Sequence, residues 1–271
     1  MSLRIQNNVE AFNAQRNLVS NSNQLSKAME KLSSGYRINR ASDDAAGLAI
    51  SEKLRAQVGG LQQAQRNAQD AVSLVSTAEG ALSEVHAMLQ RTRDLAVQFA
   101  NGTLSTADKA AITAEVAQLS AEISRIGSQT KFNGIDLLTG GATISFQIGV
   151  DDGQTLTVGA RSLMGTSTAD VDSSIFSFSG TTVLASIDQA IANVSTARST
   201  FGSVQNRLEH TLNNLSSYEE NLTASESRIR DVDMASEMVN FTKLQILQQA
   251  GTAMLSQANS APQSVLSLLR G

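Results

Sequence analysis

Residues 61–96 read LQQAQRNAQDAVSLVSTAEGALSEVHAMLQRTRDLA, and an apolar residue stands at every seventh position of this stretch. Seven residues make about two turns of an α-helix, so these side chains form one stripe along a helix. The stretch 187–229 has the same period. The pattern predicts two long helices packed as an antiparallel bundle or coiled coil. The repeating positions are Leu54, Leu61, Ala68, Val75, Leu82, Leu89 and Ala96, then Ile187, Val194, Phe201, Leu208, Leu215, Leu222 and Ile229.

A shorter helix is predicted between these two. Ser105-Thr106-Ala107-Asp108 has the form of a capping box, in which a serine and an acidic residue three positions later satisfy the first backbone amides of a helix. Asn101-Gly102 separates this helix from the one before it, and Gly127 with Asn133-Gly134 closes it. Its apolar residues step by four and three positions at Ile112, Val116, Leu119, Ile123 and Ile126.

The length of the first helix predicts an elongated molecule. A helix from near Asp43 to Phe99 rises about 1.5 Å per residue and is roughly 85 Å long, whereas a compact chain of this size has a radius of gyration of about 18 Å. Gly59-Gly60 weakens the helix by about 1 kcal/mol per glycine. We expect packing to override this cost, and the sequence predicts a rod.

Residues 142–160 change to a two-residue alternation of apolar and polar side chains, which predicts a β-hairpin with its turn at Asp151-Asp152-Gly153. The following stretch, 161–182, is rich in Ser, Thr, Gly and Asp and predicts an irregular connector that caps one end of the rod. The expected fold class is therefore mainly α, an elongated bundle of long helices with a small β-hairpin and an irregular tip.

The two ends of the chain are apolar on one face and almost uncharged on the other. From 5 to 25 the only charges are Glu10 and Arg16, and from 241 to 271 only Lys243 and Arg270. A helix whose outer face meets water normally carries charges there. We expect the two ends to pair, to be covered outside by other copies of the chain, and to be largely disordered until assembly. Their apolar stripes are Ile5, Val9, Phe12 and Val19, then Leu244, Leu247, Gly251, Met254, Ala258, Ala261, Val265 and Leu268.

Composition excludes several classes of function. The 271 residues include no cysteine, two histidines and one proline, with a formal charge of −4. There is thus no disulfide framework, thiolate metal site or cysteine nucleophile, and no basic surface for nucleic acid. No apolar run approaches the roughly 18 residues of a membrane span, and we expect no membrane insertion. The first residues lack the features of a cleaved signal peptide, which favours a soluble chain or one exported by another route.

Isolated polar residues give no sign of catalysis. His86 has no HExxH pattern around it and is expected to be a surface or interhelical residue. Asp43-Asp44 follows Ser42 at a helix start, where carboxylates complement the helix dipole. Asp151-Asp152-Gly153 is too short for a calcium loop. We expect no catalytic, cofactor or metal site, so an enzyme is the least favoured class.

The two chain ends resemble a known family. Residues 32–51 read LSSGYRINRASDDAAGLAIS, which resembles the N-terminal signature of bacterial flagellin. Residues 245–251 read QILQQAG, and 262–270 read PQSVLSLLR after QAN at 257–259, which is similar to the flagellin C-terminus. The resemblance covers the chain except for about 140 to 182. Since many flagellins have large outer domains there, this chain resembles a short form with the inner core and rod alone.

The resemblance implies a structural subunit of the extracellular flagellar filament, exported unfolded and self-assembling into a helical polymer for swimming. The implied domains are a core of paired terminal helices, 1–42 plus 232–271, and a rod, 43–231. The implied partners are further copies of the chain, an export chaperone, the filament cap, a hook-filament junction protein and a host Toll-like receptor. The segment Gln90, Arg91, Arg93, Asp94 and Leu95, with Glu115, matches the receptor-contact segment of flagellins, and the alternative for these charges is a solvated helix face.

Two other classes stay open. A hook-filament junction protein is disfavoured because the flagellin C-terminal signature is so complete here. A coiled-coil signalling module should carry charged residues beside its apolar stripe over its whole length, and the uncharged ends argue against it.

Overall fold

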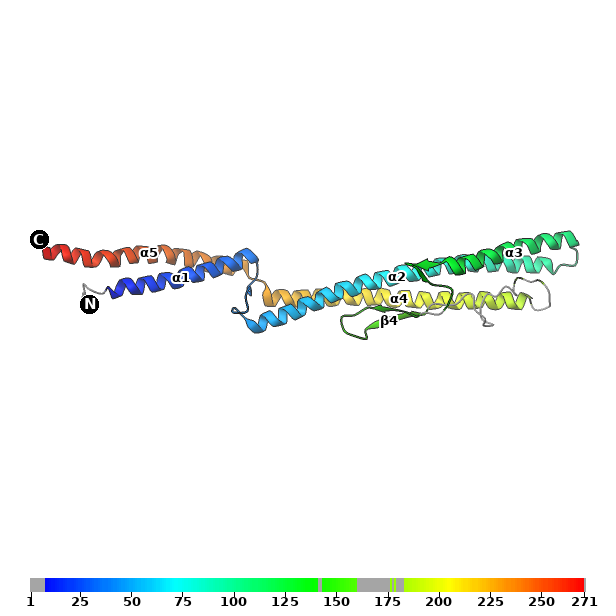
Figure 1. Cartoon of the computed structure of the whole chain (residues 1–271), viewed down its shortest axis with the longest axis horizontal. Coiled ribbons are helices and arrows are strands. Elements are labelled where there is room, and N and C mark those ends of the chain that lie inside the picture. The colour runs from blue at the N-terminus through cyan, green and yellow to red at the C-terminus, as the bar shows by residue number, and fades with distance from the viewer. Residues whose placement is uncertain (1–7, 141–142, 160–175, 177, 179–182, 271) are drawn as a thin grey trace. The chain divides into compact units, whose positions relative to one another are not determined.

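The structure is a computed structural model that describes residues 8–140, 143–159, 176, 178 and 183–270, with the backbone alone over 262–270. Over these residues the chain is mainly α-helical with small antiparallel hairpins, which confirms the predicted fold class (Figure 1). The elements are α1 (Val9–Ser34), α2 (Ala45–Phe99), α3 (Thr106–Gln129), β1 (Lys131–Phe132), β2 (Ile135–Asp136), β3 (Thr143–Gln147), β4 (Thr155–Gly159), α4 (Val183–Arg230) and α5 (Met234–Arg270).

The chain divides into two compact units. One comprises residues 1–56 and 221–271 and contains α1 and α5, and the other comprises 57–220 and contains α3 and both hairpins. The helices α2 and α4 each run from one unit into the other. The first unit therefore extends further into α2 and α4 than the terminal-helix domain expected from the sequence.

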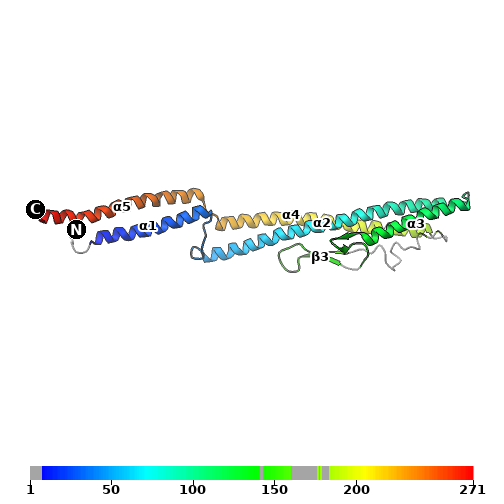
Figure 2. The same ribbon diagram turned by 45° about the horizontal axis from the view of Figure 1, so that its top comes forward.

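The core of the second unit lies between α2, α3 and α4, which run side by side (Figures 1 and 2). The predicted seventh-position residues are buried on α2 from Leu61 to Ala96 and on α4 from Ile187 to Leu215. Ile112, Val116 and Ile123 of α3 are buried in the same core. The seven-residue repeat therefore identified the buried faces of both long helices.

Helix α2 continues through Gly59-Gly60 without a break, as expected. At Gly60 the absent side chain also has a packing consequence, because an added Cβ atom would lie 3.0 Å from Cγ1 of Val150 near the hairpin turn. The side-chain amide of Asn67 donates a hydrogen bond of 2.9 Å to the carbonyl of Gln147. The hairpin thus lies directly on α2.

The predicted β-hairpin is confirmed as β3 and β4, with Ile144 paired with Val158 and Phe146 with Leu156. Val158 and Leu156 are buried in the core. The chain turns near Gly153, whose φ of 85° lies in the left-handed region that glycine adopts without strain.

A second, smaller hairpin of β1 and β2 was missed. The sequence pattern predicts only the end of a helix at Asn133-Gly134, but Asn133 (φ 50°) and Gly134 (φ 79°) form a turn with both central residues left-handed. Asn-Gly is the commonest sequence for such a hairpin turn. The signal was present in the dipeptide, and the two-residue strands on either side were too short to show alternation.

Helix α3 begins as predicted. The Ser105 hydroxyl accepts from the Asp108 amide at 3.2 Å, and the Asp108 carboxylate accepts from the Ser105 amide at 3.0 Å. Hydrogen bonds from the Ser105 hydroxyl and amide lower the pKa of Asp108.

Of the expected connector only two residues are described: Phe176 is buried in the core, and the Phe178 ring lies 5.2 Å from that of Phe99. Residues 161–175, 177 and 179–182 of this connector lie outside the described residues.

The core of the second unit gives a test of this packing. Leu89 is fully buried, so Leu89→Ala should lower the free energy of unfolding by about 2–5 kcal/mol through lost apolar burial and the cavity left behind. Val97→Ala, at a half-exposed position of the same helix, is the control. Urea unfolding followed by circular dichroism measures both, and equal effects of the two substitutions would contradict the assigned core.

Candidate functional site

The terminal helices α1 and α5 pair side by side and antiparallel (Figure 1), as predicted for the chain ends. The side-chain amide of Asn8 donates to the carbonyl of Ala258 at 2.7 Å, and that of Asn21 donates to the carbonyl of Leu244 at 2.9 Å. At Gly251 an added Cβ atom would lie 3.1 Å from Leu18 Cδ1. Asparagine amides and a small residue thus hold the two backbones close together.

This pairing leaves many large apolar side chains of α1 and α5 exposed to solvent. Among the predicted assembly residues whose side chains the structure describes, only Leu244 is buried, with 4% of its surface exposed, whereas Phe12 is 61% and Met254 65% exposed. Ile5 lies outside the described residues, as do the side chains of Val265 and Leu268. A group of large apolar residues that are exposed to solvent marks an interaction surface. The exposed ones on these two helices include Val9, Phe12, Val19, Met234, Met238, Val239, Ile246, Leu247 and Met254.

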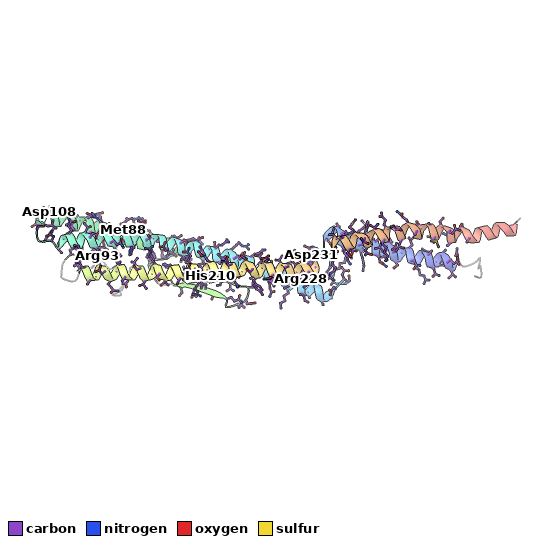
Figure 3. All side chains as sticks on the ribbon, turned by 180° about the vertical axis from the view of Figure 1, so that it is seen from behind. Met88, Arg93, Asp108, His210, Arg228 and Asp231 are labelled. Atoms are coloured by element: carbon purple, nitrogen blue, oxygen red, sulfur yellow. The ribbon has the colours of Figure 1, made fainter. Side chains whose placement is uncertain are left out.

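The segment 35–44 and the start of α5 form a joint with the end of α4. Helix α1 ends at Gly35, which adopts the left-handed conformation (φ 77°), and the Val232 amide donates to the Gly35 carbonyl at 3.0 Å. Tyr36 pairs with Asp231 in an antiparallel bridge. Figure 3 labels Asp231 at this end of α4. The two linkers, distant in sequence, are therefore hydrogen-bonded to each other.

Two arginines complete this joint. The Arg37 amide donates to the Arg230 carbonyl at 2.6 Å, and its guanidinium donates to the Ile229 carbonyl at 2.5 Å, which satisfies acceptors in the last turn of α4. Arg230 has only 12% of its side chain exposed. Its guanidinium pairs with Glu52 of α2 at 2.7 Å and lies over the Tyr36 ring at 4.7 Å. Arg230 thus links three segments.

The acidic pair of the signature has the helix-start role expected for it. Asp44 accepts from the Gly47 amide at 2.8 Å, and Asp43 accepts from the backbone amides of Arg40 at 3.0 Å and Asn39 at 3.2 Å. The hydrogen bond from Arg40 is the largest cause of the lowered pKa of Asp43, followed in the same direction by that from Asn39 and the charges of two lysines. These residues fix the turn that enters α2.

The proposed receptor segment lies where α2 meets α3. The Arg91 guanidinium donates from Nε at 2.9 Å and from Nη2 at 2.7 Å to one oxygen of Glu115, and both side chains are about half exposed. Gln90 is exposed beside them, with its side-chain nitrogen 3.0 Å from His86. Leu95 differs, because only 2% of it is exposed. Its side chain packs in the core and offers no surface to a partner.

Among the described residues there is no group of three or more His, Asp or Glu side chains placed to hold a metal ion. No helix in this part of the chain has the length and apolarity of a membrane span. The features that stand out are therefore the exposed apolar face of α1 and α5, the joint beside it and the surface shared by α2 and α3.

This arrangement defines a class of helical proteins whose two chain ends pair while leaving an apolar face uncovered. The model of the bacterial flagellin N-terminal helical region matches residues 5–143, and that of the C-terminal helical region matches 184–269. The chain belongs to the bacterial flagellin family.

Individual relatives agree with this assignment. The chain is 53% identical to a flagellin of Halalkalibacterium halodurans, over 98% of this chain and 99% of the relative. It is 48% identical to the flagellar filament 33 kDa core protein of Treponema phagedenis, over 98% and 99%. A structure of a putative flagellar hook-associated protein from Vibrio parahaemolyticus, 18% identical, has the same fold over 70% of this chain and all of that one, with a TM-score of 0.59.

Asp43 gives a pH test of the joint. Its pKa is lower in the folded chain than the value of about 3.9 in an unfolded one, so its carboxylate stabilises the fold above that pH and the contribution is lost as pH falls through the folded pKa. Asp43→Asn keeps the shape and removes the charge. We expect the variant to melt at a lower temperature than the parent at pH 7 and the gap to close below pH 4. A gap that stays constant from pH 7 to 3 would contradict this role.

Proposed function

We propose that this protein is the structural subunit of a bacterial flagellar filament, self-assembling outside the cell into a helical polymer that serves swimming motility. The observation that carries the proposal is the uncovered apolar face of the paired helices α1 and α5. The names of its relatives, flagellin and flagellar filament core protein, support it. The role is structural rather than catalytic.

The geometry favours assembly through unlike surfaces. These exposed side chains belong to the two chain ends. They are about half exposed, so burying each against another copy contributes about 1 kcal/mol, roughly half the value for a fully exposed side chain. When such a surface docks on a different part of the next copy and the contacts do not close into a ring, a helical polymer results. Asn, Gln and Ser between the apolar residues suit a wet, weakly charged channel lining.

Export of the unfolded chain is the second part of the proposal. A chain without cysteine forms no disulfide that would have to be avoided or reduced before transit. The apolar ends need cover before assembly, which is the task of an export chaperone, and a filament cap and hook-filament junction protein would be the partners at the two ends of the polymer. The terminal helices are proposed to order fully on assembly.

Assembly is tested with purified monomer at rising concentration, with and without preformed seeds, by negative-stain electron microscopy and circular dichroism. The parent should form long filaments with a gain in helicity. Met254→Asp should raise the critical concentration at least tenfold, because one large apolar contact is replaced by a charge. Met254→Leu, which keeps the apolar contact, is the matched control. A fully helical monomer that never polymerises would overturn the proposed function.

We also propose that the surface of Gln90, Arg91 and Glu115 is recognised by the vertebrate Toll-like receptor for flagellin. The support is the exposed arginine held by Glu115 on the adjacent helix, a fixed and planar hydrogen-bond donor. The buried Leu95 would contribute by positioning α2 instead of touching the receptor.

Arg91→Ala should reduce receptor activation in a cell reporter assay and leave filament formation intact, since the residue is exposed and outside the core. Arg66→Ala removes the same charge from another exposed position of α2 and is the control. Unchanged activation by Arg91→Ala would remove the receptor contact from the proposal and leave the filament role untouched.

A further inference from the structure

Three polar pairs join α2 to α4, and their α2 members are regularly spaced. The α2 members are Gln65, Glu79 and Arg93, which are fourteen residues apart and so share one position of the seven-residue repeat. Figure 3 labels Arg93 on α2. Each reaches a side chain of α4, and we call this set the polar ladder. Its rungs are Gln65 to Glu219 at 2.8 Å, Glu79 to Arg198 at 2.7 Å and Arg93 to Asp188 at 2.6 Å.

The apolar faces alone only weakly determine the axial register of α4 on α2. Buried residues recur every seven positions on both α2 and α4, so displacing α4 by seven residues again sets apolar residues against apolar residues. Such a displacement moves a helix by about 10 Å along its axis. Within residues 57–220 the apolar core is therefore compatible with more than one register, and a feature that depends on alignment would favour one of them.

The polar ladder supplies that feature. Seven residues on either side of Arg198 stand Ile191 and Gln205, and neither offers a positive charge to Glu79. The neighbours of Asp188 at the same spacing are Thr181 and Ser195, and those of Glu219 are Leu212 and Glu226. A one-step slip in either direction therefore removes both ion pairs at once.

We infer that the polar ladder is the specificity device that fixes the register of α2 on α4. The ion pairs are one-third to one-half exposed, so each contributes little to stability in itself. Their effect is to make the competing registers worse, because a slip leaves the partly buried Glu79 and Arg198 unpaired. The inference concerns the fold of residues 57–220 and goes beyond the proposed filament role.

The test is a distance measurement in the full chain. Because the chain has no cysteine, Thr77→Cys and Ser216→Cys place two spin labels at exposed positions of α2 and α4. Glu79→Arg with Arg93→Glu sets like charges on two rungs without changing the net charge. Double electron–electron resonance should then show a second distance between the two labels that differs from the first by about 10 Å, the axial rise of seven helical residues. Adding Arg198→Glu and Asp188→Arg should restore the single parental distance.

Two further variants keep the result decisive. Glu84→Arg with Arg66→Glu makes the same exchange at exposed positions of α2 outside the polar ladder, and should keep one distance. Glu79→Gln with Arg93→Gln removes the attraction without adding repulsion, and should show the displaced distance as a minor population if the reversed variant fails to fold. One unchanged distance in both rung variants, or no recovery in the fourfold variant, would overturn the inference.

Discussion

Burial of one apolar stripe between α2, α3 and α4 is the constraint on which the rest of the structure depends. The seventh-position residues of α2, from Leu61 to Ala96, and of α4, from Ile187 to Leu215, lose contact with water only when the long helices lie together. Isolated helices are marginal in water, and most of their stability comes from packing of an apolar face. The β3–β4 hairpin then lies on the same core through Leu156 and Val158, and the joint at Arg230 ties the start of α2 to the end of α4.

The terminal helices follow a different balance of forces. Their backbones are held together by amide hydrogen bonds from Asn8 and Asn21, and they approach each other closely at Gly251. Most of their large apolar side chains stay exposed. The second unit buries its seventh-position residues within the chain, whereas under the proposed function the exposed apolar residues of α1 and α5 would be covered by another copy.

Sequence periodicity predicted the elements that are defined by a repeated pattern of buried residues. It did not predict features that depend on a single turn or contact. The seventh-position residues, the capping box at Ser105 and the β3–β4 hairpin followed from patterns repeated over several residues. The β1–β2 hairpin rests on one Asn-Gly turn, and the buried position of Leu95 depends on which side of α2 faces α3. The joint was recognisable only as a signature, because its bonds from Arg37 and Arg230 join segments nearly 200 residues apart.

The two kinds of surface in this chain suit the two demands on a filament subunit of the proposed kind. The contact between α2 and α4 inside each copy is driven by apolar burial, and under the inference above its register is set by paired charges such as Glu79 and Arg198, whose attraction depends on alignment. Contacts between copies would be made by exposed apolar side chains such as Phe12 and Met254, which gain free energy from losing water whichever neighbour covers them. If apolar burial alone determined both the contacts inside a copy and the contacts between copies, the two kinds of surface could substitute for each other during folding and association. Separating them lets the chain settle its own register before its ends are buried by other copies.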